Sequence, residues 1–91
     1  MQIEQLERLK DVAIPIDDAD GRSDRQRDAE EVFYNAVRET VGEEDFVVIC
    51  NIMNNCLMAT EEALVFAYNC AHHGLDYVIE ALNIDESMMQ G

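Results

Sequence analysis

The sequence predicts a small all-α protein, a compact bundle of about five helices, and three observations lead to this class. The 91 residues include one proline and four glycines, so long stretches carry no residue that interrupts a helix. Hydrophobic residues make up 48% of the chain, which is enough for one modest core. The apolar side chains recur every three or four residues, which is the spacing of one helix face.

A single domain is expected over residues 1–91, because a chain of this length has the size of one folding unit. It divides into an N-terminal helix with an acidic loop over 1–22, a helical core over 23–83 and a tail over 84–91. We expect the tail to be frayed or to form one short turn.

The first predicted helix covers Gln2–Val12, and the acidic loop Asp17–Gly21 follows it. The second helix begins after Ser23, an N-cap that forms a capping box with Gln26, and it ends at Gly42 as a C-terminal cap. The residues expected to face the core are Ile3, Leu6 and Leu9 in the first helix and Ala29, Val32, Phe33, Ala36, Val37 and Thr40 in the second.

The third predicted helix, Glu43–Met58, has an unusually wide apolar arc of about 200°. Such a helix is either central to the fold or covered by a partner. Its polar side is narrow and also carries Val47 and Met58. The arc comprises Phe46, Val48, Ile49, Cys50, Ile52, Met53, Cys56 and Leu57, and the polar side comprises Glu44, Asn51, Asn54 and Asn55.

The fourth predicted helix starts at Thr60, a good N-cap residue, and ends at Gly74. Alanines recur every four residues along it, at Ala63, Ala67 and Ala71, which permits close approach of another helix or only reflects the high helix propensity of alanine. The fifth helix is predicted at Leu75–Asn83, with Leu75, Val78, Ile79 and Leu82 on its apolar face.

Charge is distributed very unevenly along the chain. The net charge is −14, from 20 acidic against 6 basic residues, and the last lysine or arginine is Arg38. Residues 1–42 hold 11 acids and all 6 bases, whereas residues 43–91 hold 9 acids and no base. Such a surface repels nucleic acid and anionic membranes and attracts basic proteins, although acidity also serves solubility alone. The helix–glycine–helix segment Ala63–Leu82 has no cation, which argues against direct DNA binding.

A calcium loop and a membrane span are both unsupported by the sequence. Placing Gly21 at the sixth position of an EF-hand loop puts Asp18 and Asp20 at acidic positions, but Ile16 and Arg27 then stand where the first and last ligands belong. No run of about 18 apolar residues is present.

The three cysteines and two histidines indicate no recognisable metal or catalytic site. Cys50 and Cys56 lie about 120° apart around one helix, so they do not easily share an ion. Cys70 with His72 or His73 is the one local pairing, and a metal or redox site at Cys70 and His73 stays open as a third hypothesis. We expect no enzyme activity, no metal and no cofactor. The cysteines are expected to be reduced, buried residues of a cytoplasmic protein.

The preferred hypothesis is a non-enzymatic protein that binds and inhibits or regulates a basic nucleic-acid-binding protein or complex. Acids spaced three or four residues apart on a helix can imitate a row of phosphates. Size and charge alone, with no shared motif, are similar to those of virus-encoded blockers of bacterial defence such as anti-CRISPR and anti-restriction proteins. A viral nucleic-acid mimic acting in the host cytoplasm is therefore one specific form of the hypothesis. The predicted partner-binding residues are Glu43, Glu44, Asp45, Glu61, Glu62, Asp76, Glu80, Val47, Asn54, Asn55 and Met58.

The alternative hypothesis is a helical protein-interaction or dimerisation module that acts through an apolar seam. The wide apolar arc of the third predicted helix is the surface that suggests it. This hypothesis predicts binding that is insensitive to salt, whereas the acidic hypothesis predicts binding that salt weakens.

Overall fold

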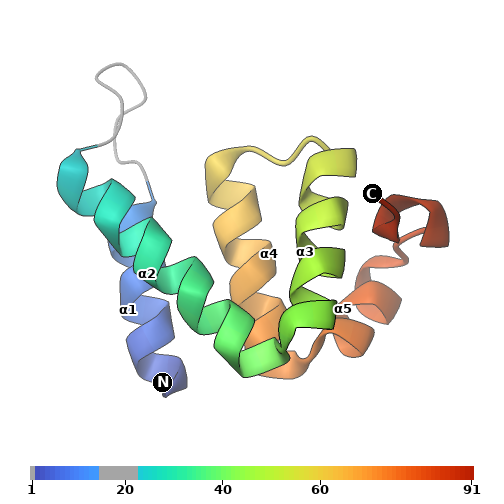
Figure 1. Ribbon diagram of the computed structural model, residues 1–91, viewed down its shortest axis with the longest axis horizontal. Coiled ribbons are helices and arrows are strands. Elements are labelled where there is room, and N and C mark those ends of the chain that lie inside the picture. Colours follow the sequence, from blue (N-terminus) through green and yellow to red (C-terminus); the bar gives the residue numbers. More distant parts are fainter. Residues whose placement is uncertain (1, 15–22) are drawn as a thin grey trace.

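The computed structural model describes residues 2–14 and 23–91, and these form an all-α bundle (Figure 1). No strand occurs among the described residues. The predicted fold class is therefore confirmed, and the helical boundaries agree with prediction to within a few residues. The α-helices are α1 (Ile3–Ala13), α2 (Asp24–Val41), α3 (Glu43–Asn55), α4 (Thr60–His73) and α5 (Leu75–Leu82), and a short 3₁₀ helix, η1 (Glu86–Met89), follows them.

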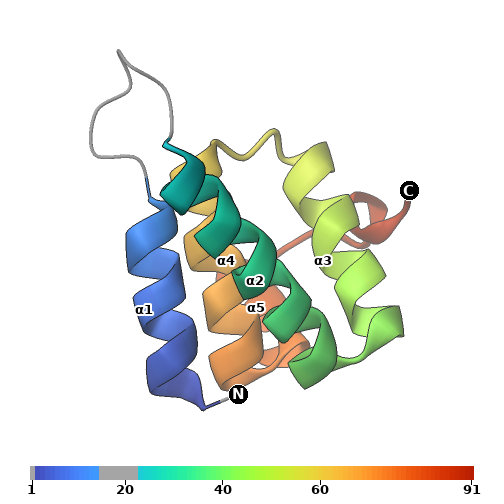
Figure 2. The ribbon, with the colours of Figure 1, turned by 60° about the vertical axis from the view of Figure 1, so that its left-hand side comes forward.

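Helix α4 is the centre of the bundle. It packs against α1, α2, α3 and α5, and the two ribbon views show it between these neighbours (Figures 1 and 2). Its residues Leu64, Ala67 and Cys70 are fully buried. Ala67 is thus a packing residue that lets neighbouring helices approach closely, whereas Ala63 and Ala71 are half-buried.

Helices α1 and α2 form an antiparallel pair on one side of α4 (Figure 2). The predicted capping box at Ser23 and Gln26 is confirmed, and the Gln26 side chain also donates to the carbonyl of Ile14 at 3.2 Å. Lys10 lies 4.6 Å from the ring centroid of Tyr68 and so links α1 to α4.

The predicted core face of α2 is only partly buried. Its residues Ala29, Phe33, Ala36 and Val37 reach the core, whereas Val32 and Thr40 are exposed. The acidic loop Asp17–Gly21 lies outside the described residues.

Helix α3 is shorter than predicted because the chain leaves the helix after Asn55. Leu57 has a left-handed backbone with φ 52°, and the Met58 N–H donates to the Met53 carbonyl, which closes the helix end. Cys56 and Leu57 are exposed, so their assignment to the apolar arc was wrong. The rest of the arc is covered within the chain: Phe46, Ile49 and Ile52 are buried, Val48, Cys50 and Met53 are partly buried, and α2, α4 and η1 pack around the helix.

The start of α4 also differs from prediction. Thr60 is the first helical residue and not the N-cap, which is Ala59. Ala59 has no side chain able to accept a backbone N–H, so no side-chain hydrogen bond caps α4. The Thr60 prediction was wrong by one position, since the loop after Asn55 places Ala59 in the extended conformation of the cap.

The C-terminal tail forms the short turn and is not frayed. It packs on α3, where the Asn51 side chain donates to the Met89 carbonyl at 3.0 Å. The Asn55 side chain donates to the carbonyls of Met88 and Gln90, both at 2.8 Å. Two amides on the polar side of α3 therefore hold η1 in place and satisfy backbone carbonyls that a frayed tail would leave to solvent.

Replacing Asn55 by alanine is expected to release η1 from α3. The change removes two hydrogen bonds, each worth about 0.5–1.5 kcal/mol, while leaving the core intact. Amide hydrogen exchange should become faster at Met88 and Met89, with a modest loss of global stability. Asn54→Ala is the matched control, since Asn54 is an exposed neighbour. Equal exchange rates in the two variants would contradict the assigned role of Asn55.

Candidate partner-binding surface

Six of the seven predicted partner-binding acids occupy the first turns of helices. Three of them begin α3, two begin α4 and one begins α5. None of these three helices has a side-chain hydrogen bond at its N-cap. Carboxylates in a first turn interact favourably with the partial positive charge of the helix start, so they stabilise helices that lack caps. These residues are Glu43, Glu44 and Asp45 in α3, Glu61 and Glu62 in α4, and Asp76 in α5.

The structure divides the acids into two groups at opposite ends of the molecule. Helices α3 and α4 are antiparallel (Figure 1), so the acids that begin α3 lie far from Glu61 and Glu62. The separation is about 20 Å, the length of a helix with the 13 residues of α3. Asp76 begins α5 directly after α4 ends, which places it at the same end as Glu43–Asp45. Glu80 is exposed farther along α5.

The last cation of the sequence is already engaged within the protein. Arg38 Nε lies 3.2 Å from Glu43 Oε2, and its guanidinium lies 4.7 Å from the ring centroid of Phe46. Both contacts hold the side chain where α2 meets α3. Glu43 is thereby paired with a base from α2, whereas α3, α4 and α5 themselves contain no lysine or arginine.

The four non-acidic residues predicted to bind a partner differ in their surroundings. Val47 is 48% exposed, and Asn54 is also exposed. Asn55 is exposed as well, but its amide donates to the C-terminal carbonyls. Met58 is half-buried and packs against the core. The structure does not bring Val47 and Met58 together, since they lie near opposite ends of α3.

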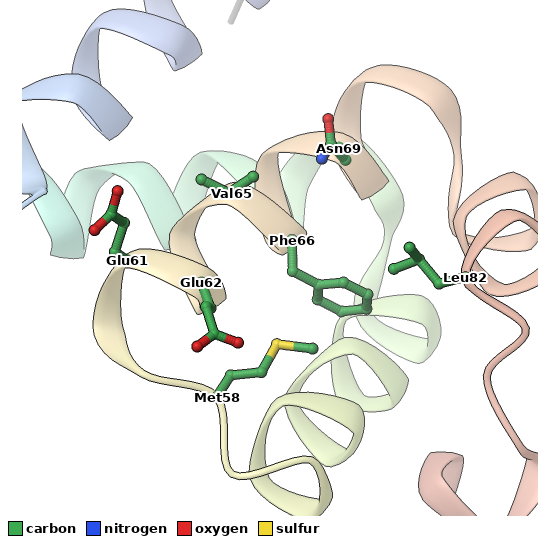
Figure 3. A pocket seen from close by; sticks show the side chains of 7 residues that line it. All are labelled: Met58, Glu61, Glu62, Val65, Phe66, Asn69 and Leu82. Atoms are coloured by element: carbon green, nitrogen blue, oxygen red, sulfur yellow. The ribbon is translucent and has the colours of Figure 1, made fainter.

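An apolar groove of about 400 Å³ lies beside α4, and Figure 3 shows it closely. The Phe66 ring lies in the middle of the view, with Leu82 on one side and Met58 and Glu62 on the other. Val65 and Asn69 follow along α4, and Glu61 marks the outer rim. We call this feature the α4–α5 groove, lined by Met58, Glu61, Glu62, Val65, Phe66, Asn69 and Leu82.

Two residues of the groove were not predicted to lie at the surface. Leu82 has the spacing of a core residue in α5, yet it is 59% exposed, whereas Leu75 and Val78 of the same face are buried. Val65 is 38% exposed on α4. No sequence signal distinguishes Leu82 from its buried neighbours, because its exposure depends on where α5 ends. Three other lining residues, Met58, Glu61 and Glu62, are in the predicted binding set.

The groove continues along the junction of α4 and α5. A second hollow shares Asn69 and Leu82 with it and extends to His73, Tyr77 and Val78. His73 and Tyr77 are in ring contact, with centroids 5.2 Å apart, and so connect the end of α4 to α5. The combined feature therefore follows α4 from its first turn to its last.

The cysteines and histidines show no arrangement that holds a metal among the described residues, where no group of three potential ligands is found. Cys70 is buried, and burial raises the pKa of its thiol to about 12, with Asp45 adding to the effect. A raised pKa is the opposite of what a nucleophilic thiolate requires. Cys50 is half-buried, and Cys56 is exposed, so the prediction that all three cysteines are buried was wrong for Cys56.

Comparison with protein-family models, curated protein sequences and solved structures finds no match for this chain. Within the residues that the structure describes, none of the helices has the length and apolar character needed to cross a bilayer. Function must therefore be argued from the surface itself.

The double substitution Glu61→Gln and Glu62→Gln is expected to destabilise the protein. It removes two carboxylates from the uncapped start of α4, each worth about 0.3–1 kcal/mol at low salt. The loss in unfolding free energy, measured by urea denaturation, should shrink as salt is added, because salt screens the helix-terminus charge. A salt-independent loss, or a gain in stability, would contradict this role of the two acids.

Cys70 is expected to make stability fall at alkaline pH. Its folded-state pKa lies above the ordinary value of 9.0, so above that pH the unfolded chain loses a proton that the folded chain keeps. The contribution of Cys70 to the unfolding free energy is therefore constant below pH 9. It decreases as the pH rises from 9 toward 12, by up to about 1.4 kcal/mol per pH unit.

The measurement is urea denaturation across this pH range for the protein and for Cys70→Ala. The alkaline fall should be smaller in Cys70→Ala and unchanged in Cys56→Ala, because Cys56 is exposed in the folded state. Identical pH profiles for all three proteins would show that the Cys70 thiol does not carry this dependence.

Proposed function

We propose that this protein is a non-enzymatic binder of a basic protein surface. Its target is a nucleic-acid-binding protein or complex, which it inhibits or regulates by occupying the site that otherwise receives phosphates. The observation that carries the proposal is the surface of α3, α4 and α5, where exposed acids stand without any lysine or arginine beyond Arg38.

The charge layout supports a role in binding more than one in solubility alone. Like charges held together raise the free energy of the folded state, and interspersed lysines reduce that cost in ordinary acidic proteins. Here Arg38 pairs with Glu43, and the other acids at the starts of α3, α4 and α5 have no lysine or arginine within their own helices. The negative field of such acids accelerates encounter with a basic partner and orients it before contact.

The two acidic groups also suit a partner whose cationic cleft is long. Glu44, Asp45 and Asp76 lie at one end of the bundle, and Glu61 and Glu62 lie about 20 Å away at the other. Phosphates along one DNA strand are spaced by about 3.4 Å of rise, so this separation matches about six nucleotides. A nucleic-acid mimic of the anti-CRISPR or anti-restriction kind, encoded by a virus and active in the host cytoplasm, is the specific form of the proposal.

A second candidate function is a protein-interaction module held by apolar surface. It is favoured by exposed apolar side chains that line the α4–α5 groove, where Leu82 is 59% exposed and Val65 is 38% exposed. Exposed apolar patches on small proteins frequently mark binding sites. The two functions are compatible when one partner supplies both cationic and apolar groups.

The proposal is tested by immobilising the protein and applying a nuclease-treated bacterial lysate. Nucleic-acid-binding proteins should be retained at low salt and released by high salt or by added duplex DNA, because DNA competes for the same cationic cleft. Retention of no such protein, or retention that duplex DNA does not disturb, would contradict the proposal.

A charge-matched pair of variants sharpens this test. Neutralising Glu44, Asp45 and Asp76 should weaken retention by about tenfold, because three uncompensated charges are lost. Neutralising Asp28, Glu31 and Glu39, which are exposed on α2, changes the net charge equally and should have a smaller effect. Equal effects of the two triple variants would show that only the total charge matters.

A further inference from the structure

The α4–α5 groove combines an apolar floor with an acidic rim. Phe66 is nearly fully buried and forms the floor, while Val65 and Leu82 remain exposed along the sides. Glu61 and Glu62 stand at one end, and Glu62 points to the same side as Met58 (Figure 3). An apolar side chain placed over Phe66 would remove these side chains from water, which is the main source of affinity in a groove of this kind.

The charge around the groove favours a cationic binding partner. Among the described residues, no lysine or arginine lines either the groove or its continuation past His73 and Tyr77. Glu80 adds a third carboxylate beside Tyr77. A second copy of this chain would bring a net charge of −14 against an equal charge, so self-association through this surface is opposed by repulsion. A cationic occupant gains from the same field.

The shape and length of the groove favour a helix as the bound segment of the partner. Its walls are two packed helices, and the described residues offer no strand edge onto which an extended peptide could add. The α4 residues that line it run from Glu62 through Phe66 and Asn69 to His73, which is one stripe at helical spacing. That stripe is about 17 Å long, the length of a helix of about three turns.

We propose that the α4–α5 groove binds a basic amphipathic helix of the partner protein. Apolar residues of that helix, three or four positions apart, lie over Phe66 between Met58 and Leu82. Its lysines or arginines lie beside Glu61, Glu62 and Glu80. Met58 suits such a site because its flexible side chain adapts to the shape of the anchor. This inference rests on the proposed function and specifies which element of a basic partner is recognised.

The experiment uses a synthetic peptide of leucine and lysine, about four helical turns long, with leucines on one helical face. A peptide of the same composition in scrambled order is the control. Titration into the isotope-labelled protein, followed by amide chemical shifts, should shift Val65, Phe66, Asn69 and Leu82 with the amphipathic peptide. The scrambled peptide should bind more weakly, because it presents the same charge without an apolar face.

Matched variants test whether the peptide binds in the α4–α5 groove. Leu82→Gln should weaken peptide binding by about tenfold, whereas Val32→Gln, at an exposed valine on α2, should leave it unchanged. Glu62→Gln should weaken binding by about threefold at low salt. Glu31→Gln should not, because Glu31 is an exposed acid on α2, outside the proposed binding surface. Unfolding curves of each variant show whether it is folded at the temperature of the titration.

The outcomes separate this inference from the proposed function. Shifts confined to Glu43–Asp45, equal binding of the scrambled peptide, or normal binding by Leu82→Gln would overturn the groove inference and leave the acidic binder in place. Absence of any peptide binding would also overturn it. Failure of the lysate proteins to be displaced by duplex DNA would overturn the proposed function, whatever the peptide does.

Discussion

The packing of α4 against four other helices is the constraint on which the rest of the structure depends. A helix in that position must present small or apolar side chains to its neighbours, because a polar group there would lose its hydrogen bonds to water. Leu64, Ala67 and Cys70 meet this requirement and are fully buried. The eight-residue helix α5 leaves part of α4 uncovered, including Val65 and Asn69, which line the groove. The α4–α5 groove is therefore a direct consequence of how the centre of the bundle is built.

The C-terminal segment determines which apolar surface is exposed. Asn51 and Asn55 hold η1 against α3 through backbone carbonyls, so η1 joins α2 and α4 in covering that helix. After α5 the chain turns at Asn83, which has a left-handed backbone with φ 54°, and η1 then packs against α3. Because the chain turns away at that point, Leu82 is left without cover. The sequence pattern suggested an apolar binding surface on α3. In the structure, the apolar groove lies between α4 and α5 instead.

The acids serve two purposes that are physically compatible. At the starts of α3, α4 and α5 they interact with helix N-termini that lack side-chain caps. The same carboxylates create the negative field of this half of the molecule, because each helix terminus compensates only part of a unit charge. Their positions at helix starts also explain why they form two groups, since antiparallel helices begin at opposite ends of a bundle. The stabilising role and the proposed binding role therefore use the same residues.

The sequence by itself determined the all-α class, the order of the helices and the charge layout, because these follow from local periodicity, from caps such as Ser23 with Gln26, and from the absence of cations after Arg38. It also placed Met58, Glu61 and Glu62 in the candidate site. Only the tertiary structure decided that α4 is central, that Asn55 holds the tail, and that Leu82 and Val65 border a groove. Those features depend on which helices touch, and helical periodicity identifies an apolar face without identifying the neighbour that covers it.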